Sequence, residues 1–599
     1  MEKDKIKIEN GIAKDVDFST TSGKKIFWHS SAHLLACAVR HLFPDVKVAI
    51  GPSIETGFYY DFDNLNITKD DFAKIEKEMY SMVNKALPFE YKEVTRKEAL
   101  ELFKNEPYKL ELINDLPKDE KITVYKLGDF LDLCKGPHLE NVSPIKSIKI
   151  MNIAGAYWKG NEKNKMLTRI YAVSYPNKDL LKKYLKFLED AKRRDHRKLG
   201  RKLDLFLFSE LVGAGLPLYT PKGNIIRNEI IQFSRELQTK IGYEEVHTPQ
   251  FNRAELFKVS GHYDKYKEDM FKVKSNYTDE EFFLKPMNCP QHTQIYASKQ
   301  RSYRDLPVRL ADFAMLYRDE KPGELSGFSR LRGFAQDDGH AFCMPSQIKE
   351  EVGNVLKIIK TALNTYGMNY WVRLSYWDPN NKDKYLGSDE IWENAQKIIK
   401  DLAVAEKLEF VEAEGEAAFY GPKIDVIVKD ALNREWQVST VQLDFNMPKR
   451  FGLKYIDKDN TEKTPVMIHR AIVGSPDRFL SILIEHHAGK FPLWLNPRQV
   501  LIVPVADAFK DYALEIEQEL KRNNVRVNCD LRAISMNKKI RDGETLYFNY
   551  IIVVGEKERS DKTINVRIRD TKEQKELSLN DFIAKIKEEY SKRALKTLF

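Results

Sequence analysis

The segment that most constrains the fold is 308–343, VRLADFAMLYRDEKPGELSGFSRLRGFAQDDGHAFC. Two strand-like runs flank the loop EKPGELSG, whose glycines and proline predict a β-hairpin with a long loop. Successive side chains of a strand alternate between its faces, so the even-numbered residues of the return strand should share one face. They are Arg330, Arg332, Phe334, Gln336, Asp338 and His340.

This mixture of side chains is more typical of a working cleft than of a solvated strand face, which favours Thr, Lys and Glu. Arg318 on the outgoing strand can join the two arginines. Guanidinium groups bind phosphate oxygens through paired donors, and Phe334 can stack on a nucleobase. The hairpin therefore predicts a site for a phosphorylated ligand.

A second segment, VMIHRAIVGSPDRFL at 466–480, predicts a buried strand that runs into a helix. Ser475 is the expected N-cap and Pro476 the first helical residue. Arg478 then lies in the first turn, where the helix dipole also favours an anion.

A third segment, FWHSSAHLL at 27–35, places His29 and His33 on one helix face because they are four residues apart. Cys134 and His138, in LCKGPH, are again four apart. Two histidines with a cysteine and a histidine could form a tetrahedral zinc site, although no HExxH glutamate supports a metalloprotease. A metal site, a hydrolytic site and core packing all stay open at this point.

Composition narrows the class of protein only broadly. The 599 residues suffice for several domains, and the net charge of 98 − 89 = +9 suits a phosphate-bearing partner among many others. The start, MEKDKIKIENG, lacks the apolar core of a signal peptide, and no run is long enough to span a bilayer. Five scattered cysteines without a CxxC pair favour a reducing cytoplasm.

Changes of pattern along the chain predict five parts. We expect a short N-terminal extension at 1–25, a first domain at 26–181 and a basic linker helix at 182–202. A mostly antiparallel α+β block follows at 203–496 and a small α/β domain at 497–599. Within the last, QVLIVPV, YIIVVGE and INVRIRD predict strands, and 509–520 and 579–596 predict helices.

Several of these segments together resemble a known family. LYRDE…FSRLRGFAQDDGH is similar to motif 2 of class II aminoacyl-tRNA synthetases, HRAIVGSPDRF to motif 3, and 224–251 to motif 1. The combination of KPMNCPQH, QDDGH, FYGPKIDV, WQVSTVQLDF and VMIHRAIVGS resembles the threonyl-tRNA synthetase family of bacterial type. The resemblance runs from about residue 27 to the carboxyl terminus.

The resemblance implies an α+β multidomain fold: an antiparallel catalytic sheet, an α+β editing domain and an α/β anticodon-binding domain. It also implies a homodimer through motif 1 and ATP bound in a bent form with Mg²⁺. The residues it assigns are Arg318 and Arg478 to the ATP phosphates with Arg330 nearby, Phe334 to adenine, Gln336 and Gln437 to the adenylate region, and Lys423 to charge that develops during activation.

Cys289, His340 and His469 match the zinc ligands of this family, one zinc per subunit. Their spacing matches no local zinc signature, so the residues alone would be taken for core side chains. In the family, the amino group and hydroxyl of threonine complete the zinc shell, Asp338 accepts from the hydroxyl, and Tyr420, Thr440 and Gln442 line the pocket. Such a site rejects valine, which lacks the hydroxyl, but discriminates poorly against serine.

Because serine is rejected poorly, a second selection step is needed, and the HSSAH segment is the candidate for it. HSSAHLL, GPSIETGFYYDF and CKGPH resemble the family's amino-terminal editing domain, which hydrolyses serine mischarged onto threonine tRNA. Lys109 and Asp132 match further positions of that pocket. We expect metal-free editing, with a zinc-dependent variant and a purely structural domain as alternatives.

The chain also departs from the family pattern. Only about 25 residues precede FWHSS, so the family's ubiquitin-like domain is expected to be absent. Val438 and Ser439 replace the more usual Cys and Gly, and Ser439 could tighten the amino-acid pocket. Ala533 replaces an Asn expected to contact the anticodon, whereas Glu558 and Arg567 match contact positions.

The sequence therefore predicts a cytoplasmic enzyme without membrane association that joins L-threonine to tRNA(Thr) with ATP and edits seryl-tRNA(Thr). The rival hypothesis is a catalytically inactive, synthetase-like RNA-binding or regulatory protein. It predicts damage at the arginines or metal ligands, and those residues are all present.

Overall fold

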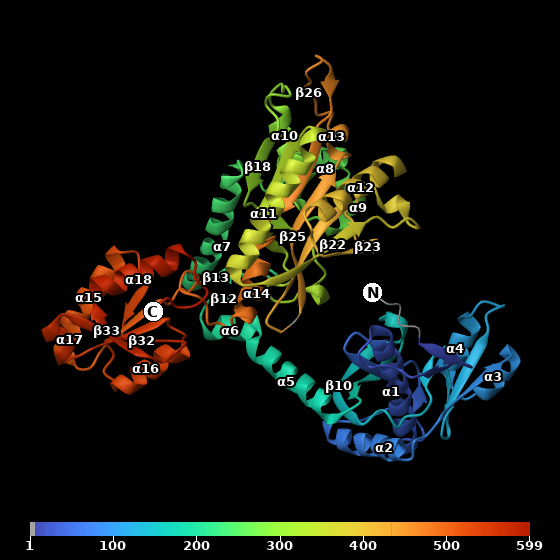
Figure 1. Cartoon of the computed structure of the whole chain (residues 1–599). Helices are drawn as coiled ribbons and strands as arrows, with labels where there is room; N and C mark the ends of the chain where they lie inside the picture. Colours follow the sequence, from blue (N-terminus) through green and yellow to red (C-terminus); the bar gives the residue numbers. More distant parts are fainter. Residues whose placement is uncertain (1–5, 433) are drawn as a thin grey trace. The chain divides into compact units, whose positions relative to one another are not determined.

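The computed structural model describes residues 6–432 and 434–599, which form two compact units that divide after Glu189 (Figure 1). The first five residues of the expected N-terminal extension lie outside the described part. Among the described residues, no helix is both long and apolar enough to cross a bilayer.

The first unit is organised around helix α1 (Thr21–Leu42), which packs on α2 (Phe72–Asn84) and on strand β5. Thr20 caps α1 by accepting from the backbone N–H of Gly23. The main sheet has the order β10-β11-β5-β3, with β4 paired to β5. Its strands are β10 (Ser147–Tyr157), β11 (Met166–Tyr175), β5 (Gly57–Asp63), β3 (Lys47–Val48) and β4 (Ser53–Ile54).

Two smaller sheets complete this unit. One joins β6 (Phe89–Val94), β7 (Ile122–Leu127) and β8 (Phe130–Leu133), with α3 (Arg96–Leu102) and α4 (Pro107–Asp115) between β6 and β7 in the chain. The other joins β1 (Lys7–Glu9), β2 (Ile12–Lys14) and β9 (His138–Leu139). The expected division at residue 25 therefore falls inside α1, and residues 12–14 pair within the first unit.

The expected linker helix at 182–202 is two helices. Helix α5 (Lys178–Arg194) ends before Asp195, and α6 (His196–Lys202) begins after it. The Asp195 side chain accepts from the backbone N–H groups of Arg197 and Lys198, so it acts as an N-cap and starts a new helix.

The second unit is built on an eight-stranded sheet of order β14-β18-β21-β28-β25-β24-β22-β23. All pairs except β14–β18 and β22–β23 are antiparallel, so the predicted sheet type is confirmed. The strands are β14 (Glu244–Glu245), β18 (Val308–Asp312), β21 (Asp338–Cys343), β28 (Val466–Ala471), β25 (Glu435–Asp444), β24 (Lys423–Lys429), β22 (Asn369–Tyr376) and β23 (Phe410–Glu414).

Helices α7 (Pro221–Lys240), α11 (Ile348–Tyr366) and α14 (Pro476–His486) share one hydrophobic core with this sheet (Figure 1). Around it lie the helices α8 (Ala254–Ser260), α9 (His262–Tyr266), α10 (Cys289–Ala297), α12 (Asp389–Ala405) and α13 (Met447–Arg450). Small sheets pair β12 (Phe206–Leu207) with β13 (Leu218–Tyr219), β15 (Phe251–Arg253) and β16 (Lys272–Val273) with β17 (Phe282–Leu284), and β26 (Tyr455–Ile456) with β27 (Glu462–Lys463).

The C-terminal part holds a five-stranded sheet of order β30-β29-β31-β32-β33. Helices α15 (Lys510–Arg522) and α18 (Leu579–Ser591) share one core with it, while α16 (Met536–Thr545) contributes to another; α17 (Glu556–Asp561) follows β31. The strands are β30 (Val527–Cys529), β29 (Val500–Pro504), β31 (Tyr550–Val554), β32 (Thr563–Ile568) and β33 (Gln574–Ser578). The three strands and two helices predicted here are confirmed within a few residues at their ends.

Candidate functional site

Strand register brings the predicted residues of the second unit together. His340 on β21 lies opposite His469 on β28, which lies opposite Gln442 on β25. Two residues along, Asp338 and Thr440 both pair with Ala471 and so point to the same side of the sheet. A cavity of about 330 Å³ lies on this side. Its lining includes Cys289, Arg318, Arg330, Phe334, Gln336, Asp338, His340, Tyr420, Gln437, Thr440, Gln442, His469 and Arg478.

One part of the cavity is cationic. The Arg318 guanidinium lies 5.2 Å from the Phe334 ring centroid, and Arg478 Nε donates to the Ser329 carbonyl at 3.0 Å. Ser475 caps α14 by accepting from the Arg478 backbone N–H, as predicted. Desolvation, and then the guanidinium groups of Arg318 and Arg330, lower the pKa of Arg478. Arg330 pairs with Glu320, so Arg318 and Arg478 are the clustered cations that favour an anionic ligand.

The predicted hairpin exists, but it is interrupted. β18 pairs with β21, while β19 (Met315–Tyr317) pairs with β20 (Gly333–Ala335) in a separate ladder. Arg332 precedes β20, so strand alternation does not apply to it, and it is not among the lining residues. Its guanidinium donates instead to the Glu320 carbonyl at 2.9 Å. The expectation that Arg330 and Arg332 share the cleft is therefore wrong for Arg332.

Lys423 is also not among the lining residues. Its Nζ lies 2.9 Å from Oδ2 of Asp425, a fully buried carboxylate that sequence reasoning missed. Asp425 Oδ1 accepts from Gln437 Nε2 at 2.8 Å and from Thr440 Oγ1 at 2.9 Å. The only signal was a single acid within the apolar strand KIDVIVK. Asp425 thus orients two residues of the cavity wall.

The ring and thiol donors of Cys289, His340 and His469 lie within 4.8 Å of one another. His340 Nε2 is 3.0 Å from His469 Nδ1, and the opposite nitrogen of His469 lies 3.1 Å from Asp444 Oδ2. A carboxylate in this place holds the proton on Nε2 and leaves the Nδ1 lone pair free toward the cluster. Burial raises the pKa of the Cys289 thiol, so a thiolate here would need a cation beside it. The donor set fits Zn²⁺.

Two further buried histidines adjoin this cluster and were missed. His262 Nε2 is 3.8 Å from Cys289 Sγ, and His292 Nδ1 is 2.8 Å from His340 Nδ1. Burial lowers the pKa of each to about 3, so both are neutral near pH 7. His292 lies in the quoted NCPQH, but no periodicity indicated its place.

The expected amino-acid pocket adjoins the same three donors. Asp338 Oδ1 lies 3.7 Å from His340 Nε2, and burial raises the pKa of Asp338. The Tyr420 ring lies 4.8 Å from the His469 ring. Val438 lines the cavity, whereas Ser439 donates to the Ile472 carbonyl and is not among the lining residues. Ser439 therefore does not tighten the pocket by itself.

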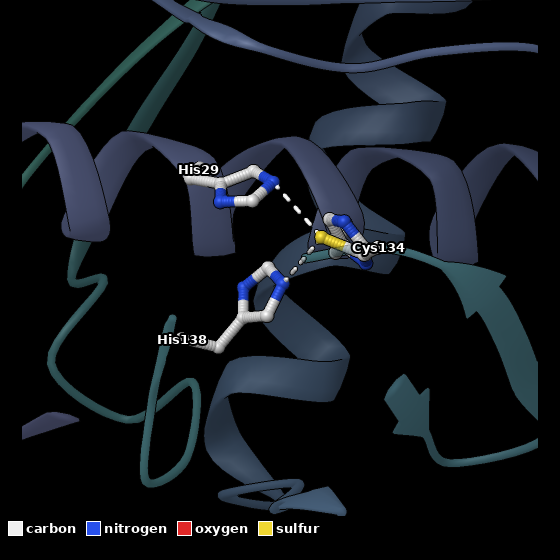
Figure 2. A group of neighbouring side chains, drawn as sticks. His29, Cys134 and His138 are labelled. Carbon is white, nitrogen blue, oxygen red and sulfur yellow. Dashed lines mark hydrogen bonds between the residues drawn. The ribbon is translucent and has the colours of Figure 1, made fainter. Parts of the chain in front are cut away.

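The first unit holds the second Cys/His cluster. His29 and His33 project from α1, Cys134 follows β8, and His138 is the first residue of β9. Their four donors lie within 4.8 Å of one another. Cys134 Sγ is 3.3 Å from His29 Nε2 and 3.4 Å from His138 Nε2 (Figure 2). The structure brings together all four residues.

Lys109 and Asp132 join this cluster, as expected. The Lys109 ammonium pairs with Asp132 Oδ1, and His33 Nε2 lies 3.6 Å from Asp132 Oδ2. Tyr60 was missed: its hydroxyl donates to Asp132 Oδ2 at 2.6 Å. Desolvation lowers the pKa of His33 to about 3 and raises that of Cys134 to about 12. The imidazole of His33 and the thiol of Cys134 are therefore neutral near pH 7. Neutral groups suit a site that polarises water better than a site that binds an anion.

The two expected anticodon contacts lie on neighbouring elements of the C-terminal sheet. Glu558 on α17 accepts from the Gly555 backbone N–H at 2.8 Å. Arg567 on β32 donates to Glu544 at 3.0 Å. Ala533 lies in the bend before α16. Both charged groups are engaged within the protein, and nothing in this geometry specifies a base.

Three family models match the chain. Residues 271–487 match the class II tRNA synthetase core domain (G, H, P, S and T), residues 499–589 match an anticodon binding domain, and residues 122–171 match the threonyl and alanyl tRNA synthetase second additional domain.

Whole-chain relatives agree with these matches. The threonine–tRNA ligase of Cytophaga hutchinsonii is 46% identical over 582 residues, which cover 96% of this chain and 90% of that protein. That of Staphylococcus carnosus is 46% identical and covers 96% of this chain and 89% of its own length. A crystal structure of the RNA binding domain of threonyl-tRNA synthetase from Cryptosporidium parvum is 40% identical with a TM-score of 0.64, covering 66% of this chain and 98% of that one.

Proposed function

This chain belongs to the threonine–tRNA ligase family, and we propose that it activates L-threonine with ATP, transfers it to tRNA(Thr) and hydrolyses seryl-tRNA(Thr). The observation that carries the proposal is the shared cavity of the second unit. An arginine cluster at one part of it and a Cys/His triad at another suit a nucleotide and a hydroxyl-bearing amino acid side by side.

We assign the cationic part of the cavity to ATP, which arrives with Mg²⁺. Arg318 and Arg478 hold the phosphates, with Arg330 nearby, and Phe334 stacks on adenine. Gln336 and Gln437 contact the adenylate region. Attack of the threonine carboxylate on the α-phosphorus releases pyrophosphate, and these guanidinium groups stabilise the charge that accumulates on the phosphates. Lys423 acts next to the cavity, where Asp425 holds its ammonium group.

We assign Cys289, His340 and His469 to Zn²⁺. The bound metal would supply an open coordination position for the amino group and hydroxyl of threonine. Asp338 accepts from that hydroxyl, and Tyr420, Thr440 and Gln442 enclose the side chain. Valine would leave the buried carboxylate of Asp338 unpaired, which is the costly kind of mismatch.

The cluster of His29, His33, Cys134 and His138 hydrolyses the seryl ester without an obligatory metal. The neutral imidazoles orient a water for attack on the carbonyl carbon, and the products are serine and free tRNA. Lys109 and Asp132 hold the histidine side of the pocket in place. A zinc-dependent reaction and a purely structural domain are the alternatives that the experiment below separates.

The remaining assignments concern assembly and place in the cell. The chain works in the cytoplasm as a homodimer through residues 224–251, and Glu558 and Arg567 contact the anticodon. The assignment of editing to the first unit and of anticodon binding to 497–599 belongs to the same proposal. An inactive RNA-binding protein is not supported, because the relatives are threonine–tRNA ligases and the predicted site residues are all present.

The test measures threonine-dependent ATP–pyrophosphate exchange and deacylation of seryl-tRNA(Thr) by the intact protein, each with and without a strong chelator. We expect a zinc-selective chelator, used with Mg²⁺ in excess, to abolish exchange and spare deacylation. Deacylation that is lost with the metal and restored by zinc would make HSSAH a ligand motif. No deacylation in either state would leave the first domain structural, and no exchange with zinc present would contradict the ligase assignment.

A further inference from the structure

One histidine in the basic segment 182–202 is buried and contacts two separate parts of the second unit. His196, the first residue of α6, is only 6% exposed. Its Nδ1 lies 2.7 Å from Glu485 Oε1, and its Nε2 lies 3.1 Å from the backbone nitrogen of Phe328. A backbone N–H can only donate, so Nε2 accepts and the ring proton sits on Nδ1, where it is donated to Glu485.

The Nε2 contact reaches the wall of the cavity. Phe328, Ser329, Arg330 and Leu331 all line it. The loop approaches His196 so closely that a Cβ on Gly327, whose φ is +49°, would lie 2.3 Å from the ring nitrogen. Only glycine fits there without displacing the ring.

The Nδ1 contact reaches the opposite end of the helix that carries Arg478. Glu485 lies in the last turn of α14, and the His196 backbone N–H also donates to it at 2.9 Å. The second carboxylate oxygen of Glu485 pairs with Arg434, so the acceptor is itself fixed. Arg478 in turn donates to the Ser329 carbonyl at 3.0 Å. His196 and Arg478 thus join the same loop to the same helix at two points.

We propose that His196 is a positioning residue for the ATP site: it fixes the loop 326–331, which carries Arg330, relative to α14, which carries Arg478, so that both arginines line the same cavity. It does not touch the ligand. The inference rests on the proposed binding of ATP in this cavity. Asp338, His340 and His469 lie on β21 and β28 and Cys289 begins α10, whereas the polar contacts of His196 go to Phe328 and Glu485, so its effect should fall on ATP rather than on threonine.

Two substitutions separate the two contacts. In H196N the amide nitrogen can take the place of Nδ1 and keep the bond to Glu485, but nothing replaces Nε2. In H196Q the amide oxygen can reach the place of Nε2 and accept from Phe328. Loss of one hydrogen bond corresponds to roughly a 3- to 10-fold change, so we expect H196N to raise the KM for ATP in pyrophosphate exchange by about that factor. The KM for threonine should stay unchanged. In H196Q the KM for ATP should stay close to that of the unsubstituted protein.

The matched control is H487N, which changes a histidine just beyond the end of α14 that is not among the cavity residues. Melting temperatures of all variants report any general loss of stability, and seryl-tRNA(Thr) deacylation reports the first unit, where no change is expected. An unaltered KM for ATP in H196N would overturn the inference. So would equal increases in both KM values in H196N and H196Q, which indicate a merely structural role. Absence of exchange in the unsubstituted protein would instead contradict the proposed function.

Discussion

The two Cys/His clusters of this protein have similar residues but different surroundings. Behind His469 stands the carboxylate of Asp444, and in front of it a cavity opens that also contains Asp338. In the first unit the Cys134 thiol lies within hydrogen-bond distance of two imidazoles, and the nearest carboxylate, Asp132, is engaged by Lys109 and Tyr60. The comparison teaches that residue type alone does not assign a metal; the groups around the donors do.

The largest effect is expected for H340A in the second unit. Loss of one of three donors should lower threonine-dependent ATP–pyrophosphate exchange by roughly 1000-fold or more, because the site can no longer select a hydroxyl. Seryl-tRNA(Thr) deacylation should be unchanged. Retained exchange would refute the assignment of Cys289, His340 and His469 as metal ligands.

The reciprocal change is H138A in the first unit. His138 is fully buried, and its Nε2 lies 3.4 Å from Cys134 Sγ. We expect deacylation of seryl-tRNA(Thr) to fall by about 100-fold or more, in the range of lost acid–base assistance, while exchange is retained. The measurement is single-turnover hydrolysis of preformed seryl-tRNA. If hydrolysis persists at the original rate, the cluster is not the editing site.

Metal analysis compares the clusters directly. We expect one zinc per chain, lost in H469A and retained in H29A, because Asp444 lies behind His469 and a cavity opens beside that cluster, whereas Asp132 in the first unit is engaged by Lys109 and Tyr60. Elemental analysis of the purified variants decides this. Two zinc ions per chain, one of them lost in H29A, would mean that both clusters bind metal.

Removing only the supporting carboxylate gives a smaller effect. D444N keeps every donor but weakens the hold on the His469 tautomer, so zinc affinity should fall by about 10- to 100-fold. Competition with a chromogenic chelator measures this affinity independently of catalysis. A matched change in the first unit, D132N, should leave zinc affinity unaltered.

A further difference concerns acid stability. Burial lowers the pKa of His33 to about 3, so the folded state resists a proton that the unfolded chain accepts below its ordinary value of 6.5. His33 therefore contributes to stability above pH 6.5 and loses that contribution as the pH falls toward 3, by about 1.4 kcal/mol per pH unit. The pH dependence of hydrogen exchange at the α1 amides should show this slope. H33Q should reduce the slope by the amount that one bound proton contributes. An equal slope in both proteins would mean that His33 is protonated in the folded state.

Much of the local structure could be predicted from the sequence. Ser475 and Pro476 predicted the start of α14. The spacing of His29 and His33 predicted that both lie on one face of a helix, which is α1. Such features depend on neighbours within one turn or one strand, which the sequence displays directly. The same logic failed at Arg332, because a break in the strand lies outside the reach of an alternation rule.

The candidate sites were predictable mainly through resemblance. Cys289, His340 and His469 are separated by 51 and 129 residues, and no periodicity connects them. The buried acids that support the cavity were not found: Asp444 lies beside His469, and Asp425 accepts from Gln437 and Thr440. Single acids in apolar strands look alike whether they support a site or end a strand.

The main helices and strands, several of their caps and the family resemblance could all be inferred from the order of the residues. Which side chains meet depends on the folded sheet: the register of β21, β28 and β25 aligns His340 with His469 and Gln442. The tertiary structure also placed His196 between a cavity loop and α14. The physical reason is that hydrogen bonds and charge interactions act over a few ångströms of space, and chain separation has no bearing on them once the sheet has formed.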